Sequence, residues 1–231
     1  MGYQPIQNYG IIGNTYTTAL VGLNGSIDWF CFPFHDSPSV FAALLDHQKG
    51  GHFKISPRTC EVTHKQFYWP ETNVLVTRFL TPEGVGEITD FMPVGMAGQE
   101  LGYHWLIRRV KVIRGSMDFL MECRPAFNYA RDEHQTILSS GGACFHSPKL
   151  SLELLTDIPL QQEDNGVFAK FELQATQTAV FVLRETEPNR GCGHPLDQSQ
   201  ADELFKQTVD YWRSWLEQCT YMGRWREIVH R

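Results

Sequence analysis

The sequence lacks any hydrophobic run that approaches the ~20 residues of a transmembrane helix. Its opening, MGYQPIQNYG, contains neither the cationic segment nor the apolar segment of a secretory signal peptide. From these two absences we expect a protein with no membrane partner and a cytoplasmic location.

Positive charge and metal-binding patterns are also scarce. The 231 residues contain 20 Lys and Arg against 26 Asp and Glu, which gives a net charge of −6. No basic patch of the kind that contacts phosphate backbones is visible, so we expect no nucleic-acid partner. The nine histidines show no metal-ligand spacing, and His194 near Cys192 offers too few groups for zinc. The sequence predicts no metal and no cofactor.

The cysteines form no C-x-x-C pair and are scattered along the chain, at Cys31, Cys60, Cys123, Cys144, Cys192 and Cys219. An even number permits a disulfide framework. Because no secretion signal accompanies them, we expect free, buried thiols.

Catalytic signatures are absent as well. The sequence contains no G-x-S-x-G, no G-x-x-x-x-G-K-[ST] and no G-x-G-x-x-G. Glycoside hydrolysis needs two facing carboxyl groups, and nothing in the sequence pairs the candidates, which lie beside turns or strand ends: Asp28, Asp46, Glu71 and Asp90. We therefore assign no catalytic residue.

What the sequence does contain is a series of short β-prone runs separated by turn signals. In GVFAKFEL, residues 166–173, apolar and polar side chains alternate, as in a strand with one buried face. Asn24-Gly25 predicts a type I′ hairpin turn, and Arg114-Gly115 predicts another tight turn. About ten strands at roughly 8–12-residue spacing predict an all-β fold. We expect a large antiparallel β-sandwich over residues 1–190, with a closed barrel as the alternative.

A helix is predicted near the C-terminus. Residues 186–198 resemble a linker, and Ser199 is the expected N-cap. Apolar side chains then recur at helical spacing through residue 219, at Phe205, Val209, Trp212, Trp215, Leu216 and Cys219. Met222-Gly223 interrupts this pattern, and RWREIVHR reads as the beginning of a second helix.

The most aromatic stretch is DWFCFPFHDSPSVFAALLD, residues 28–46. Its prolines stiffen a loop that carries candidates for a sugar-contacting rim, because rings can stack on a sugar while polar groups bond to it: Trp29, Phe34, His35 and Asp36. The alternative is structural, with Asp36 capping a short helix over SVFAALLD.

Several long motifs resemble the bacterial and archaeal branch of glycoside hydrolase family 15, which holds glucoamylase-like, glucodextranase-like and trehalase enzymes. They include YQPIQNYGIIGNTYTTALVGLNGSIDWFCFPFHDSPSVFAALLD, YWPETNVLVTRF, GVGEITDFMP, HWLIRRVKVIRGSMDFLMECRPAFNYAR and YMGRWREIVHR. The resemblance spans essentially the whole sequence. One departure lies in the first loop, where the family usually has P-R-F-D-S-P-S and this chain has Phe34 and His35 at the Arg and Phe positions.

The resemblance implies an N-terminal antiparallel super-sandwich, a linker helix and an α/α-barrel whose two glutamates hydrolyse an α-glucosidic bond with inversion. On this basis, residues 191–231 would be the linker helix and the start of the barrel. The implied partners are an α-glucan or trehalose-type sugar in the intact enzyme and the chain's own α/α-barrel. The barrel would lie against aromatic and apolar residues of the helix: Trp212, Trp215, Leu216 and Trp225.

Two alternatives from other functional classes remain. The chain could be a free-standing carbohydrate-binding module that uses the 29–36 residues. It could instead be an assembly domain that forms a homodimer through the aromatic helix, since exposed apolar patches attract partners.

Overall fold

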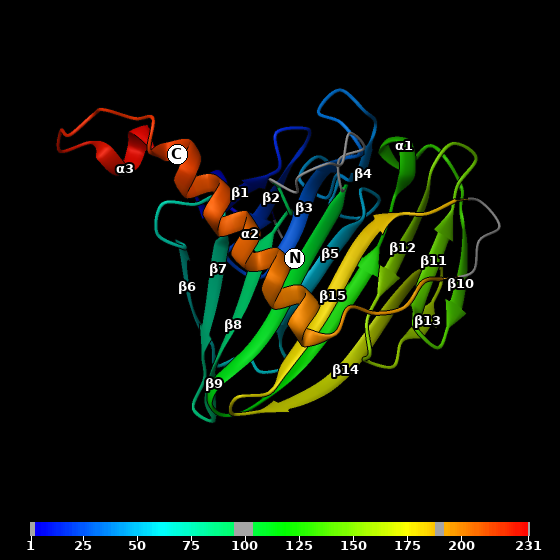
Figure 1. The fold of residues 1–231 in the computed structure, drawn as a ribbon. Coiled ribbons are helices and arrows are strands. Elements are labelled where there is room, and N and C mark those ends of the chain that lie inside the picture. The colour runs from blue at the N-terminus through cyan, green and yellow to red at the C-terminus, as the bar shows by residue number, and fades with distance from the viewer. Residues whose placement is uncertain (1–2, 95–103, 188–191, 231) are drawn as a thin grey trace.

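The computed structural model describes residues 3–94, 104–187 and 192–230 (Figure 1). It is an antiparallel β structure followed by a C-terminal helix, which confirms the predicted fold class. In chain order the strands are β1 (Tyr9–Gly13), β2 (Thr18–Gly22), β3 (Ser26–Cys31), β4 (Ser39–Phe41), β5 (His52–Pro57), β6 (Thr63–Tyr68), β7 (Leu75–Leu80), β8 (Gly84–Phe91), β9 (Trp105–Arg124), β10 (Gln135–Ser139), β11 (Gly142–His146), β12 (Ser151–Leu155), β13 (Gln161–Glu163), β14 (Gly166–Gln174) and β15 (Thr178–Glu185). The helices are η1 (Ile6–Asn8), α1 (Phe127–Ala130), α2 (Gln198–Leu216) and α3 (Arg226–Val229).

Strand β9 belongs to both layers of the sandwich. Its second half pairs with β5 and β14, in a sheet continued by β3, β2 and β1, here called sheet A. Its first half pairs with β8 and β15, in a sheet continued by β7 and β6 on one side and by β12, β11 and β10 on the other, here called sheet B. The strand order leaves free edges, so the fold is a sandwich rather than a closed barrel.

The tight turn predicted at Arg114-Gly115 is wrong, because β9 continues through it as one strand of 20 residues. Gly115 has φ +74 and lies opposite Gly84, and a Cβ at this position would meet the carbonyl oxygen of Glu83. Gly115 therefore does have a special backbone conformation, but it marks the point at which β9 passes from sheet B to sheet A and not a turn.

The core lies between the two sheets. Phe171 on β14 and Phe181 on β15 meet across it, with ring centroids 5.6 Å apart. Along β14, Val167, Ala169 and Leu173 are buried while Lys170 is exposed, which confirms the predicted alternation. Burying a large apolar side chain contributes roughly 1.5–3 kcal/mol, so the facing rows hold the layers together.

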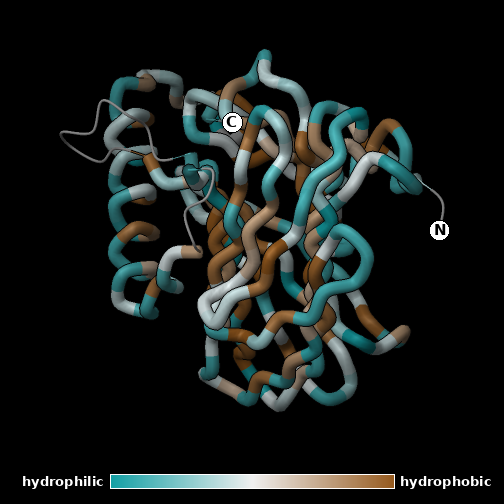
Figure 2. The backbone as a smooth tube through the Cα atoms, turned by 90° about the vertical axis from the view of Figure 1, so that its right-hand side faces the viewer, coloured by the Kyte–Doolittle hydropathy of each residue, from teal (hydrophilic) through white to brown (hydrophobic). Residues whose placement is uncertain are grey.

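Helix α2 covers the outer face of sheet B, as Figure 2 shows from the side. Leu204 and Val209 pack there in a second apolar cluster with Phe91 on β8 and Val182 on β15. At the same face, Arg109 of β9 forms an ion pair with Asp202 of the helix. None of the helices in the described ranges is both long and apolar enough to traverse a bilayer.

The predicted N-cap at Ser199 is wrong by two positions. The Asp197 carboxylate accepts the Gln200 N–H at 2.8 Å, and the Gln200 side chain accepts the Asp197 N–H at 3.0 Å. This reciprocal capping box satisfies two backbone donors, so the helix begins at Gln198. The predicted second helix is present as the short α3.

The type I′ turn predicted at Asn24-Gly25 is also wrong. Of these two residues only Gly25 has a positive φ, of +80, whereas a type I′ turn needs two. The Gly25 N–H donates to the Gly22 carbonyl at 2.9 Å, and Asn24 Oδ1 accepts the Ser26 N–H at 3.1 Å. The hairpin itself forms, with a longer connection than predicted.

The expectation of free thiols is correct for the buried Cys31 and Cys123 and wrong for one pair. Cys144 on β11 forms a disulfide with Cys192, which tethers the segment before α2 to sheet B. The two positions are 48 residues apart, and nothing in the sequence indicated that the chain returns to β11. The cytoplasmic location remains a prediction.

Candidate functional site

The loop at residues 32–38 joins β3 to β4 at one end of the sandwich (Figure 1). The Phe34 N–H donates to Ser37 Oγ and the Ser37 N–H to the Phe34 carbonyl, both at 3.1 Å. The His35 N–H donates to the Tyr16 carbonyl at 2.9 Å. The loop is thus fixed to itself and to the β1–β2 connection.

The short helix expected after Asp36 does not form. Ser39–Phe41 is instead strand β4, paired with β3, and the Val40 carbonyl accepts the Ala126 N–H at 2.8 Å. Val40 and Phe41 are β-prone side chains that bury in the sandwich core, and this tertiary burial overrides the helical pattern. Asp36 lies exposed on the loop.

The four predicted rim residues divide into groups with different neighbours. Trp29 is half-buried on β3, with its ring 6.3 Å from that of Tyr129. Phe34 is 45% exposed and lies 5.2 Å from the His104 ring. His35 and Asp36 are exposed beside Phe34. Their role at a sugar rim remains a prediction.

The sequence analysis did not identify His104 as a site residue. Its ring lies edge-on to Tyr16, Phe32 and Phe34 at 5.2–5.9 Å. Burial lowers the pKa of His104, and the smaller effect of the Glu185 charge raises it. The ring therefore stays neutral near pH 7 and serves as a polar member of an aromatic cluster.

Helix α1 contains a left-handed turn that stands against β4. Asn128, Tyr129 and Ala130 have φ values of 52, 59 and 60. This conformation costs roughly 1–2 kcal/mol per residue other than glycine. The Asn128 side chain donates to Asp132 at 2.9 Å, and the buried Phe127 anchors the turn. Strain of this kind persists only where the surrounding fold fixes it, and it gathers at functional sites.

A hollow of ≈ 180 Å³ lies between the 32–38 loop and this turn. Most of its wall is apolar, from Phe32, Pro33, Pro38, Val40, Phe127 and Leu150. Polar side chains from the turn, the β11–β12 connection and the end of β15 complete it.

The four acids considered for catalysis all have structural partners. Asp28 accepts from Tyr9 at 2.7 Å and from Ser26 at 2.5 Å, and Asp90 pairs with Arg108. Asp46 accepts two backbone N–H groups in a turn. Glu71 pairs with Arg226 at 2.9 Å. The structure therefore explains each acid without catalysis.

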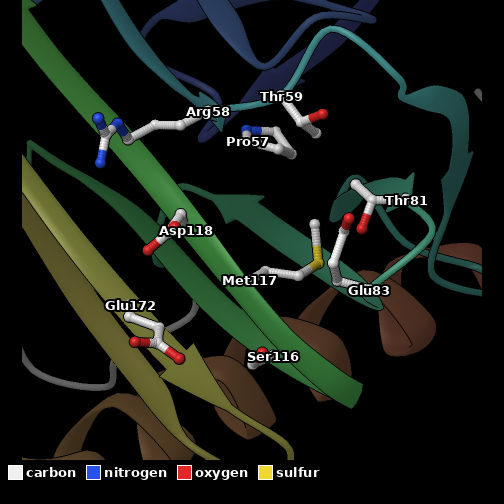
Figure 3. A pocket seen from close by; sticks show the side chains of 9 residues that line it. All are labelled: Pro57, Arg58, Thr59, Thr81, Glu83, Ser116, Met117, Asp118 and Glu172. Carbon is white, nitrogen blue, oxygen red and sulfur yellow. The ribbon is translucent and has the colours of Figure 1, made fainter.

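A second hollow, of ≈ 260 Å³, is shown in Figure 3. Asp118 on β9 and Glu172 on β14 lie directly opposite each other across the ladder, and both line the hollow. Both are exposed, whereas a general acid needs a dry site that keeps it protonated. Across the described part of the chain, no group of three or more His, Cys, Asp or Glu side chains could hold a metal ion.

The far end of α2 and the segment after it carry the predicted interface residues. Trp212 and Leu216 are half-buried, whereas Trp215 is 58% and Trp225 is 52% exposed. The Arg226–Glu71 ion pair holds α3 to the β6–β7 connection. This end of the helix thus leaves large apolar side chains uncovered.

A known protein family matches most of this chain. The family described as "Trehalase-like, N-terminal" matches residues 2–149, more than half of the chain. The chain belongs to this trehalase-like N-terminal family. The matched residues run from β1 past β11, and so include the 32–38 loop and the left-handed turn.

Curated relatives of this trehalase-like N-terminal domain are named trehalases. The trehalase of Thermoplasma volcanium is 31% identical over 234 residues, which cover 100% of this chain and 37% of that protein. Trehalase 1 of Sulfolobus acidocaldarius is 32% identical over 220 residues, or 92% of this chain and 34% of that protein. The trehalase of Mycobacterium tuberculosis is 26% identical over 254 residues, or 99% and 36%. The chain thus spans little more than a third of these relatives.

A solved structure titled a putative kojibiose phosphorylase from human microbiome covers 90% of this chain and 35% of its own, with a TM-score of 0.46 and 12% identity.

Within the trehalase-like N-terminal domain, sequence reasoning missed the left-handed turn at residues 128–130. Asn adopts this conformation readily, but Tyr and Ala do not, so only Asn128 carried a local signal. The hollow was missed for a related reason. Its wall comes from four segments separated in the sequence, and only the fold brings them together.

Proposed function

We propose that this chain is the non-catalytic N-terminal domain of a family-15-like glycoside hydrolase of the trehalase or glucoamylase type. In the intact enzyme, two glutamates of an α/α-barrel outside these residues hydrolyse an α-glucosidic bond with inversion. One carboxylic acid protonates the leaving oxygen, and the other carboxylate activates water on the opposite face of the sugar. The sandwich supports that barrel.

The observation that carries the proposal is the extent of the family match. Trehalases align with up to 100% of this chain, while the alignments cover 34–37% of T. volcanium trehalase and S. acidocaldarius trehalase 1. The remaining part of those relatives is the larger one, and it is long enough to contain the barrel and its two catalytic glutamates. The acids at residues 28, 46, 71 and 90 also support a non-catalytic role, because each is engaged in a hydrogen bond or an ion pair with another part of the chain.

The barrel is proposed to lie against the end of α2, through Trp212, Trp215, Leu216 and Trp225. Exposed aromatic residues favour such a contact, since burying each large apolar side chain is worth roughly 1.5–3 kcal/mol. Trp215 and Trp225 are more than half exposed, whereas the N-terminal half of α2 is already packed on sheet B.

Hydrolysis assays test the non-catalytic role. The purified chain is incubated with trehalose, maltose, isomaltose and dextrin, and released glucose is measured beside T. volcanium trehalase as a positive control. We expect no turnover by this chain. Turnover that disappears in D118N or E172Q would overturn the proposal, because these opposed acids would then be catalytic.

A further inference from the structure

We propose that the hollow between the 32–38 loop and the left-handed turn binds one neutral hexose unit. This site contains different residues from the predicted rim. It goes beyond the proposed function, because a sugar can bind here whether or not the protein takes part in hydrolysis.

The size and wall of the hollow select the class of ligand. At ≈ 180 Å³ it is smaller than the roughly 300–1,000 Å³ of sites for drug-sized molecules. The prolines at 33 and 38 offer an apolar surface to the C–H face of a pyranose, and the buried rings of Phe32 and Phe127 form the floor beneath them.

The polar side chains of the wall match the hydroxyl groups of a sugar. They include both donors and acceptors, contributed by Ser37, Asn128, Asp132, Ser147, Lys149 and Glu185. These side chains include two carboxylates and one ammonium group, so the site has a net negative charge. An anionic ligand such as a sugar phosphate is therefore disfavoured, and a neutral sugar is not.

The site is also held in place before any ligand arrives. Asn128 donates to Asp132 at 2.9 Å, which fixes two of its polar side chains across the left-handed turn. The β4 wall is tied to the same turn by the Ala126 N–H bond to the Val40 carbonyl at 2.8 Å. A rigid wall reduces the entropy lost on binding. The strained turn thus has a use as one side of a preformed site.

Titration calorimetry and amide chemical-shift mapping of the whole chain test the proposal, with glucose, trehalose and maltose as probes. We expect a Kd on the order of 1 mM for at least one of them, and shifts at the amides of Asn128, Asp132 and Lys149. No saturable binding, or shifts confined to other residues, would overturn it.

Variants at the exposed Lys149 separate this site from others without touching the core. K149M removes one charged donor and is expected to weaken binding about three- to tenfold, whereas K149W fills the hollow and abolishes binding. K170M and K170W, on the exposed face of β14, are the matched controls and should bind like the parent chain. Equal losses in both pairs would overturn the location.

Glucose 6-phosphate tests the charge argument. We expect it to bind at least about threefold more weakly than glucose, because the two carboxylates repel its phosphate. Equal or tighter binding would overturn the assignment to a neutral sugar. Failure of these binding tests would leave the hydrolysis assays unaffected, so the two proposals are tested separately.

Discussion

Arg108 on β9 donates its Nε–H to Asp90 on β8 at 2.8 Å, and both side chains are fully buried. The same guanidinium donates to the Phe53 carbonyl at 2.5 Å and to the Gly25 carbonyl at 2.7 Å. Asp90 belongs to sheet B, whereas Phe53 and Gly25 belong to strand β5 and the β2–β3 connection of sheet A. A buried charged pair therefore joins the two layers of the sandwich.

Removing one member of this pair should destabilise the fold strongly. R108M leaves the Asp90 carboxylate buried without its counter-charge, and we expect a loss of about 3–5 kcal/mol in the free energy of unfolding. D90L should cost a similar amount. The double variant should lose less than the sum of the two, because no unpaired charge remains. Urea denaturation of the parent, the two single variants and the double variant gives a double-mutant cycle. Strictly additive losses in unfolding free energy would contradict an energetic coupling between Arg108 and Asp90.

Gly115, the single glycine of β9, should tolerate no larger residue. G115A places a Cβ against the Glu83 carbonyl oxygen at a residue with φ +74. We expect a loss of at least about 2 kcal/mol, since strain and overpacking act together. The neighbouring S116A, at a half-buried position, is the control. Equal stability of the two variants would show that β9 does not need this bend.

Gly115 also shows what sequence reasoning can reach. The tight turn predicted at Arg114-Gly115 was wrong, although Gly115 does have a positive φ, which glycine tolerates. Whether the chain turns back there or continues depends on what pairs on either side, and that is decided by β8 and β14. The period-two pattern of β14 needed no such information, because one buried face is visible in the sequence itself.

The candidate site was predicted less well than the strands. The aromatic 29–36 stretch indicated a rigid loop, and the loop is held by several hydrogen bonds. The partners of Trp29 and Phe34, namely Tyr129 and His104, lie far away in the sequence. No spacing rule connects such positions, so the sequence could not show that Trp29 and Phe34 have different neighbours.

Reduction of the Cys144–Cys192 disulfide should destabilise the chain. Its closed loop of 48 residues corresponds to about 4 kcal/mol of unfolded-state entropy. We expect C144S, C192S and the reduced parent to unfold at lower urea concentration than the oxidised parent. The exposed free cysteine provides the control, C60S. A midpoint unchanged by reductant would contradict a stabilising role.

Stability should decrease as the pH falls below neutrality. Burial lowers the pKa of His52 below its ordinary value of 6.5, and the nearby Glu122 charge only partly opposes this. The unfolded chain therefore binds a proton at a higher pH than the folded chain. The stability present above pH 6.5 is lost as the pH falls from 6.5 toward the folded-state pKa.

Replacement of His52 tests this linkage. H52Q should show a smaller fall in unfolding free energy than the parent between about pH 7.5 and pH 5.5. H47Q, at an exposed position, is the matched control and should keep the parental slope. A slope that is the same in H52Q and the parent would show that His52 does not contribute.

The exposed end of α2 should promote self-association. Trp215, Met222, Trp225 and Ile228 are 58%, 82%, 52% and 67% exposed, and they belong to one stretch of chain at the end of the helix. Exposed apolar side chains favour association. We expect the isolated chain to form a concentration-dependent homodimer, measured by sedimentation velocity.

Substitution at this surface distinguishes such a dimer from nonspecific aggregation. W215S combined with W225S removes the two largest exposed side chains without touching the packed face of α2, and we expect it to raise the dimer dissociation constant at least about tenfold. L45S, which removes an apolar side chain 62% exposed in the β4–β5 connection, should leave it unchanged. If the parent is monomeric at every concentration, or if both variants behave alike, the end of α2 is not a homodimer surface.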